Sequence, residues 1–311
     1  MNALPDATRV PRDALWTYLR ATLKTIYKKR HAYYFIGPFF ILFSIFFLYP
    51  AVRSIMLSLY KREGFGAYSY VGGANYLHLV RDPVFLKAIL NSVYLMVSTT
   101  AIQIVLAVAI AVALNATFVR FRKVLRSIYF SPIILSAVVV SIVFSLIFDK
   151  QYGFLNYLLS LVGIGKVGWT TTTALSKVAV AILVIWRWTG WNMVIVLAGL
   201  QGIPPELNDA AKVDGAGSWA LFRYITLPLL QPVLVFITML GVIDGLRLFA
   251  EPAVLTEGGP AQSSLTMVMY LSQQAFKYHA FGYASAIAVA IFALVAVISL
   301  ISWRFINQGE A

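Results

Sequence analysis

Long apolar stretches separated by short polar ones run along most of this chain. A helix needs about 20 consecutive, mostly apolar residues to cross the hydrocarbon core of a bilayer. The pattern therefore predicts six transmembrane helices, at about 33–52, 89–114, 125–148, 178–200, 229–250 and 281–303. The expected fold class is an all-α membrane protein, with a basic segment at 1–32 and one transmembrane domain at 33–311.

The positions of Lys and Arg orient these helices. An even number of spans puts both termini on the same side of the membrane, and loops rich in Lys and Arg stay in the cytoplasm. Basic residues are concentrated in segment 1–32 and in the loop after the second span, at Arg120, Arg122 and Lys123. Both termini and the polar segment 203–232 are therefore predicted to be cytoplasmic. The segments predicted to be external, which either cover the spans or bind a partner, are 53–88, 149–177 and 251–280.

The composition agrees with a membrane protein. Hydrophobic residues make up 60% of the 311 residues and charged residues 12%, about half of the charged fraction that is usual in globular proteins. The net charge of +13 alone would suit a nucleic-acid-binding protein. Because the basic residues follow the membrane topology, we expect a lipid bilayer and no nucleic acid as the partner.

The sequence contains no recognisable catalytic or metal-binding pattern. The absence of cysteine excludes disulfides, thiolate metal sites and cysteine nucleophiles. His31, His78 and His279 lie far apart, and neither an HExxH motif nor a glycine-rich phosphate loop occurs. We therefore expect no catalytic residue, no metal and no cofactor on this chain. A membrane-embedded enzyme is the alternative from another functional class.

The polar segment 203–232 stands out between the fourth and fifth spans. Pro205 and Glu206 suit the first turn of a helix, because proline lacks an amide hydrogen and a carboxylate favours the positive end of the dipole. The predicted helix runs from Pro205 to Asp214 and ends at Gly215 or Gly217, and Ser218 is predicted to cap a second helix. One face of the first helix carries mostly small side chains, at Leu207, Ala210, Ala211 and Asp214. An ordinary surface helix-turn-helix explains the same pattern.

The same segment resembles the cytoplasmic loop of permease subunits of binding-protein-dependent ABC importers. The signature of that loop is Glu-Ala-Ala, a glycine, and a hydrophobic stretch that ends in proline. Here Asp209 stands where the family usually has glutamate, and Ala210, Ala211, Gly215 and Pro228 match. The resemblance implies a coupling helix within the loop 201–228 that docks on a separate ATPase. The coupling residues that it implies are Glu206, Asp209, Ala210, Ala211, Asp214, Gly215 and Ala216.

Two further stretches resemble carbohydrate-type permeases of the maltose and glycerol-3-phosphate importer group. They are LTEGGP at 255–260 and FGYASA at 281–286. The resemblance implies import of a sugar, an oligosaccharide or a sugar-like polyol across a bacterial or archaeal inner membrane. It further implies three partners, namely an ATP-binding subunit dimer that holds ATP and Mg²⁺, a second and similar permease, and an extracytoplasmic substrate-binding protein.

Polar residues inside two predicted spans mark a candidate substrate path. Ionisable side chains are costly within a bilayer and are functional candidates for that reason. Tryptophan faces beside hydrogen-bonding groups suit a sugar. The candidates are Arg187, Trp188, Trp191 and Asn192 in the fourth span, and Asp244 and Arg247 in the fifth. Two other interpretations stay open, namely an Arg187–Asp244 ion pair that only holds the spans together, and a phosphorylated ligand on Arg187.

A secondary transporter is the other transport hypothesis. Inverted repeats, which many such transporters contain, are not evident in this sequence. The polar segment 203–232 would then also have no assigned partner. Copurification of an ATPase would distinguish the importer from both alternatives.

Overall fold

The computed structural model describes residues 28, 30–62, 66–116 and 120–307. Most of the predicted basic segment 1–32 lies outside these residues. The chain divides into two compact units, one ending at Met56 and the other beginning at Leu57.

The first unit is a helical rod of apolar residues. It consists of α2 (Arg30–Phe43), the π-helical turn η1 (Ser44–Leu48) and α3 (Tyr49–Leu57). The continuous apolar stretch is Tyr33–Leu57, which is longer than the predicted span 33–52. Its large side chains, from Tyr33 to Met56, are exposed in this unit. The surface of this helix is therefore suited to lipid or to another membrane helix.

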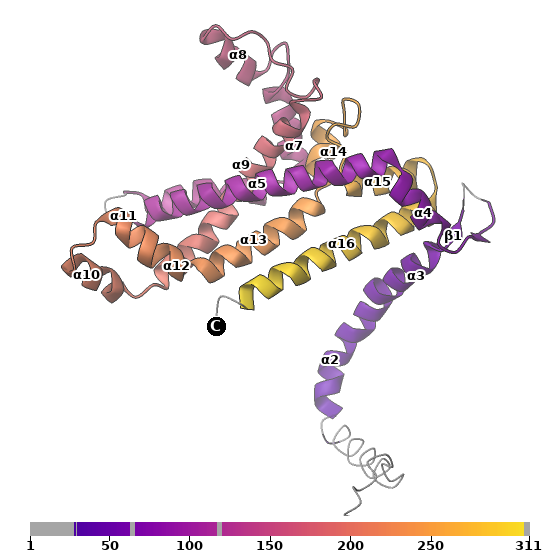
Figure 1. Ribbon diagram of the computed structural model, residues 1–311, viewed down its shortest axis with the longest axis horizontal. Helices are drawn as coiled ribbons and strands as arrows, with labels where there is room; N and C mark the ends of the chain where they lie inside the picture. The colour runs from indigo at the N-terminus through magenta and orange to yellow at the C-terminus, as the bar shows by residue number, and fades with distance from the viewer. Residues whose placement is uncertain (1–27, 29, 63–65, 117–119, 308–311) are drawn as a thin grey trace, which may run out of the picture. The chain divides into compact units, whose positions relative to one another are not determined.

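Three long helices form the frame of the second unit. They are α5 (Pro83–Asn115), α9 (Ser176–Gln201) and α16 (Phe281–Asn307). Helix α5 packs against α9 and against α13 (Gln231–Leu246), and α13 packs against α16 (Figure 1). Small residues bring α5 and α9 close together, because Ala107 and Ala111 are fully buried beside Met193 and Val196. These contacts place the polar residues of α5, α9 and α13 on neighbouring helices.

The third predicted span, 125–148, is a bent pair of helices, and a second bent pair begins before the fifth predicted span, 229–250. Helix α6 (Arg122–Ile134) meets α7 (Ala137–Ile147) at 99°. Residues Ser218–Leu229 meet α13 at 63°. Leu135 adopts an extended conformation between α6 and α7, and Pro228 and Pro232 flank the second bend. Among the described residues, four single helices are long and apolar enough to cross a membrane, or up to six if each bent pair is one span.

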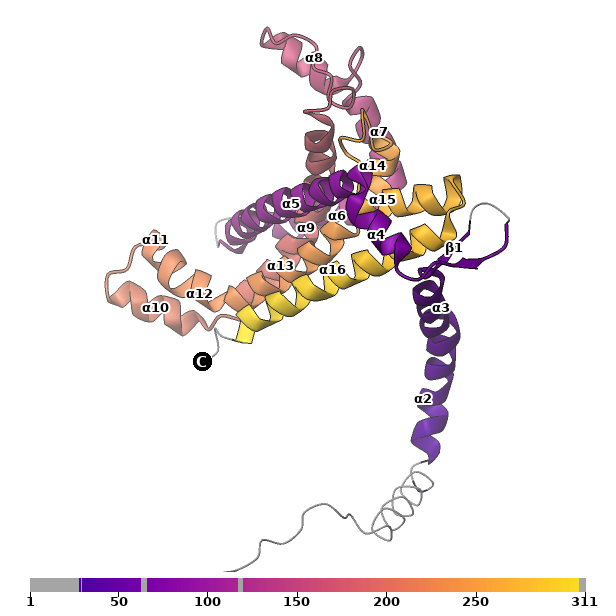
Figure 2. The ribbon, with the colours of Figure 1, turned by 45° about the vertical axis from the view of Figure 1, so that its right-hand side comes forward.

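Shorter elements lie at the two ends of this unit. At one end are α10 (Pro205–Val213), α11 (Ser218–Leu221), the π-helical turn η2 (Phe222–Thr226) and α12 (Leu227–Leu229). The other end carries α4 (Ala74–Arg81) and the antiparallel strands β1 (Tyr60–Lys61) and β2 (Ser69–Tyr70), with Tyr60 opposite Tyr70 (Figures 1 and 2). Apart from this small sheet, the regular elements of the described residues are helical, as the sequence predicts. The remaining elements are α8 (Phe154–Leu161), α14 (Ala250–Leu255), α15 (Met267–Ser272) and the π-helical turn η3 (Gln273–Lys277).

The loop between α14 and α15 is held by side chains of the long helices. The Nδ2 of Asn91 on α5 donates to the carbonyls of Gln262 and Leu265, at 2.9 and 3.0 Å. Ser176 at the start of α9 shares a hydrogen bond with Ser263, with 2.6 Å between the two hydroxyl oxygens. The GGP turn at 258–260 is therefore part of a loop fixed to α5 and α9.

Asp82 joins the start of α5 to α15 and α16. Its Oδ1 accepts hydrogen bonds from the amides of Val84 and Phe85, at 2.9 and 3.3 Å. Its Oδ2 accepts from the hydroxyls of Tyr270 and Tyr283. Burial alone would raise the pKa of the Asp82 carboxyl, but these four hydrogen bonds together lower it below its usual value.

Replacing Asp82 with asparagine is expected to lower the free energy of unfolding by about 1–3 kcal/mol at pH 7. The amide turns an NH₂ toward two hydroxyl donors that need an acceptor. Because the lowered pKa belongs to the folded state, the stabilisation is present above about pH 4 and is lost as the pH falls further. Thermal unfolding in detergent at several pH values measures the difference.

Asp149→Asn is the matched control for this substitution. Asp149 is exposed, and its Oδ1 accepts from the amides of Gln151 and Tyr152 at 2.8 and 2.7 Å, which an asparagine oxygen also does. We expect no measurable change in unfolding temperature for this variant. A difference between wild type and Asp82→Asn that does not shrink under acidic conditions would contradict the role of the carboxylate.

Candidate coupling helix and substrate cavity

Helix α10 ends in a defined glycine cap. The amide of Gly215 donates to the carbonyl of Lys212 at 3.0 Å, and the amide of Ala216 donates to the carbonyl of Ala211 at 2.9 Å. This pair of bonds is the Schellman motif, in which the residue after the helix adopts a left-handed conformation. Gly215 has φ +84°, as the motif requires. The predicted helix from Pro205 and the predicted end at Gly215 are therefore confirmed.

The surface around α10 is exposed and partly apolar. All nine residues of α10 are described, and none of them is buried. Val213 is 88% exposed and Trp219, on α11, is 73% exposed. Asp209 forms an ion pair with Lys212, at 3.0 Å between Oδ1 and Nζ, which contributes little to stability because both side chains are exposed. This combination suits a surface that another protein covers.

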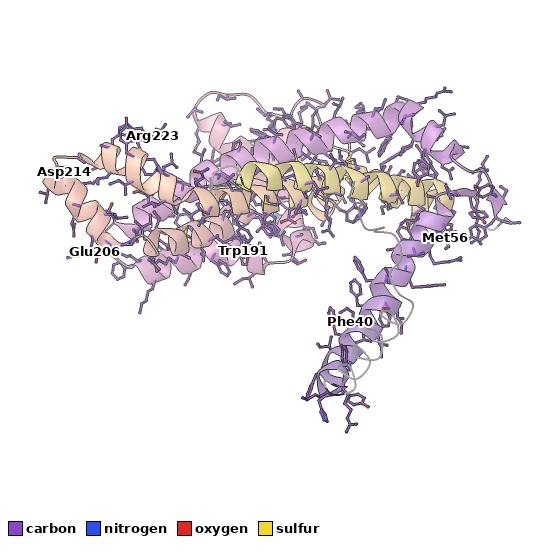
Figure 3. The ribbon with its side chains drawn as sticks, turned by 60° about the horizontal axis from the view of Figure 1, so that its bottom comes forward. Phe40, Met56, Trp191, Glu206, Asp214 and Arg223 are labelled. Atoms are coloured by element: carbon purple, nitrogen blue, oxygen red, sulfur yellow. The ribbon has the colours of Figure 1, made fainter. Side chains whose placement is uncertain are left out.

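The predicted coupling residues lie together at one end of the second unit. Figure 3 shows Glu206 on α10, Asp214 directly after its end and Arg223 on η2 at this end of the unit, and Trp191 closer to the middle. The prediction that Ser218 caps the second helix is wrong. Gly217 occupies the cap position, and Ser218 is the first residue of α11.

A cavity of about 420 Å³ lies between α5, α9, α13 and α14. Five of the six predicted path residues line it, namely Arg187, Trp188, Asn192, Asp244 and Arg247. Trp191 does not line it. Its ring instead packs against Phe130 of α6, with 6.0 Å between the ring centres. Consecutive turns of α9 thus contribute a cation, an aromatic face and an amide to one cavity.

Arg187 forms its ion pair with Glu251 of α14. The distance from Nη1 to Oε1 is 2.9 Å, and the two side chains are only 13% and 6% exposed. Its Nη2 also donates to the carbonyl of Leu135, at 3.3 Å, where the third span bends. The Arg187–Asp244 pair considered from the sequence is therefore replaced by an Arg187–Glu251 pair, which ties α9 to α14 and to the end of α6.

Two amide side chains complete the polar wall of the cavity. Asn192 donates from Nδ2 to the Oε1 of Gln103 at 3.3 Å, and Gln103 donates from Nε2 to the carbonyl of Val184 at 3.1 Å. Both residues are buried. The wall therefore presents donors and acceptors that are fixed by other protein groups.

The family assignment follows from comparison with known proteins. Residues 103–309 match the family of binding-protein-dependent transport system inner membrane components.

The chain is a permease of this family.

Among its relatives, the lactose transport system permease protein LacF of Rhizobium radiobacter is 38% identical over 92% of this chain and 97% of its own length. The arabinooligosaccharides transport system permease protein AraP of Bacillus subtilis is 36% identical over 89% of this chain and 88% of its own length. A chain of a bacterial alginate ABC transporter, solved with an alginate pentasaccharide-bound periplasmic protein, has the same fold. Its TM-score is 0.80 at 22% identity, over 90% of this chain and 94% of that one.

The family assignment confirms the resemblance seen in segment 203–232. This permease is a multi-pass inner membrane component of an ABC transporter and is not the ATPase. Among the residues that the structure describes, no group of three metal-ligating side chains occurs.

Three polar residues that line the cavity of this permease were not predicted from the sequence, namely Thr99, Gln103 and Glu251. Thr99 and Gln103 lie within the apolar stretch 89–114, where a polar amide such as that of Gln103 is a sequence signal for a functional residue. Glu251 directly follows the predicted fifth span, so it read as the first residue of an external loop. Its place in the cavity depends on the end of α13 at Leu246 and the short helix α14, which the hydrophobic pattern does not define.

Proposed function

We propose that this permease is the transmembrane subunit of an ATP-driven ABC importer for a sugar, an oligosaccharide or a sugar-like polyol. The observation that carries the proposal is the 38% identity to the lactose permease LacF over nearly the whole chain. The similarity to AraP supports the same substrate class. The cavity agrees with it, since Trp188 offers an apolar face beside fixed amides and charges.

In the proposed topology the chain crosses the inner membrane six times, with each bent pair of helices as one span. Both termini and α10 lie in the cytoplasm, and the domain 33–311 forms the membrane part. The proposal is supported by the excess of basic residues in the predicted cytoplasmic segments. The C-terminal end of α16 lies near α12, at the end of the unit that carries α10 (Figure 1).

Helix α10 is the proposed coupling element. Its exposed face and the residues around Gly215 dock on the ATP-binding subunit dimer, which holds ATP and Mg²⁺. The chain enters α10 from α9 and leaves it toward α13. Closure of the ATPase dimer moves α10 and, through these connections, moves the helices that line the cavity. This movement opens the cavity alternately to the outside and to the cytoplasm.

The substrate path in this proposal runs through the cavity lined by Arg187, Trp188, Asn192, Asp244 and Arg247. A substrate-binding protein delivers the sugar from outside the membrane, and a second permease completes the path. The exposed apolar side chains of α7, such as Val139 and Val143, form a surface suited to that second permease.

The test combines purification with uptake. Tagged permease purified from its native membrane in mild detergent is expected to bring an ATPase and a second permease, both identified by mass spectrometry. Cells that lack the gene are expected to lose uptake of one labelled neutral or acidic sugar, and the plasmid-borne gene restores it. Isolation of the chain alone, with uptake driven by an ion gradient instead of ATP, would favour a secondary transporter.

A further inference from the structure

The formal charges of the ionisable residues that line the cavity cancel. Two cations, Arg187 and Arg247, and two anions, Asp244 and Glu251, line it. Arg247 and Asp244 lie within one turn of each other at the end of α13. The formal charge of the lining is therefore zero. A ligand that carries a net negative charge finds no excess of positive charge in this cavity.

Glu251 forms an ion pair with Arg187, the cation that would otherwise bind an anionic ligand. Its carboxylate is 2.9 Å from the Nη1 of Arg187, and the side chain of Glu251 is 6% exposed. A ligand carboxylate or phosphate on Arg187 would have to displace this contact and leave Glu251 as an unpaired buried charge, which is strongly unfavourable. The ligand would also be repelled by Glu251 at short range.

The cavity nevertheless offers contacts for a neutral group. The amides of Gln103 and Asn192 can share hydrogen bonds with a sugar hydroxyl, which brings no charge. The ring of Trp188 offers an apolar face for the sugar.

We propose that the cavity selects uncharged carbohydrate, and that Glu251 is the residue that excludes uronates and sugar phosphates by neutralising Arg187. The inference rests on the proposed function. Arg187 by itself is compatible with a neutral or a phosphorylated ligand, and the inference selects the neutral one.

The experiment measures binding to the permease without the substrate-binding protein, which has its own selectivity. The permease is purified with its partner subunits in lipid nanodiscs. The first probe is the sugar that the uptake experiment identifies. The second probe has the same carbon skeleton but differs by one carboxylate. It is made by oxidising one position of a neutral sugar to a carboxylate, or by reducing the carboxylate of an acidic sugar. Isothermal titration gives the association constant of each probe, and their ratio is the selectivity.

Wild type is expected to bind the neutral form more tightly. Glu251→Gln keeps the size and the hydrogen bond to Arg187 but removes the negative charge. We expect the ratio to shift by about tenfold toward the acidic form, the effect of one hydrogen bond to an uncompensated charge. The double variant R187Q/E251Q restores a neutral lining and is expected to lose this gain. It also serves as the folding control, because neither charge is left unpaired.

Three results for the binding ratio would overturn the inference. They are tighter binding of the acidic form by wild type, an unchanged ratio in Glu251→Gln, and the same gain in the double variant. Absence of binding by wild type would also overturn it, because the cavity would then not be a sugar site. In each case ATP-dependent sugar uptake by cells and copurification of the ATPase decide the proposed function separately.

Discussion

Replacing Gly190 with alanine is expected to remove most of the folded permease from the membrane. Gly190 is buried in α9, where the helix lies against the backbone of α6. A Cβ at this position would lie 1.7 Å from the carbonyl oxygen of Tyr129 and 2.5 Å from its carbonyl carbon. Backbone atoms do not rotate away as a side chain does, so α6 has to move as a whole. Overpacking costs about 1–3 kcal/mol where side chains adjust, and more where they do not.

Displacement of α6 has a second consequence in the cavity. Gly190 lies one turn from Arg187, whose Nη2 donates to the carbonyl of Leu135 just after the end of α6. Moving α6 away from α9 lengthens this hydrogen bond and loosens the Arg187 side chain. The alanine variant that does fold is therefore expected to bind sugar more weakly than wild type.

The measurement is the amount of full-length protein in the membrane and its unfolding temperature in detergent. Gly202→Ala is the matched control near the end of the same helix. A Cβ at Gly202 has its nearest neighbour at 3.4 Å, an ordinary contact, so stability is expected to stay at the wild-type level. If Gly190→Ala unfolds at the wild-type temperature, the close packing of α6 on α9 is wrong.

The positions of the membrane-spanning helices could be predicted from the sequence better than the bends within them. Hydrophobic stretches identify the spans because transfer into a bilayer depends on composition over about 20 residues. The 99° bend between α6 and α7 has no comparable signal. Leu135 and Ser136 are ordinary residues within an apolar stretch, and their extended conformation is supported by contacts such as the one from Arg187. Tertiary contacts of this kind override local preference.

The candidate site was predicted unevenly for a similar reason. The end of α10 depends on local chemistry, since a glycine at the residue after a helix is a short-range signal. The ion-pair partner of Arg187 depends instead on which acidic residue of another helix lies beside it in the folded protein. Asp244 and Glu251 are both acidic residues near the end of the fifth span, and only the start of α14 at Ala250 decides between them. Trp191 does not line the cavity, because its ring packs against Phe130 of α6.

The second large effect is expected at Gly215, whose replacement by aspartate should abolish transport while the protein stays folded in the membrane. Gly215 has φ +84°, and a left-handed conformation costs a residue with a Cβ about 1–2 kcal/mol. That cost lowers the population of the capped turn by about tenfold. A Cβ there meets nothing within 4 Å in this chain, so the core keeps its packing. The loss is therefore expected in uptake and in sugar-stimulated ATP hydrolysis, and absent from the unfolding temperature.

Gly217→Asp separates backbone strain from the added charge. Gly217 lies two residues further on, also with open space around its Cβ, but its φ is −73° and it occupies the cap position of α11. Aspartate is favourable at such a position. This variant carries the same charge in the same loop and is expected to transport normally, whereas Gly215→Ala, with strain and no charge, is expected to follow Gly215→Asp. If the two aspartate variants fail equally and the alanine variant works, charge at the proposed docking surface is the cause, and the geometry of the cap is not what couples α10 to the ATPase.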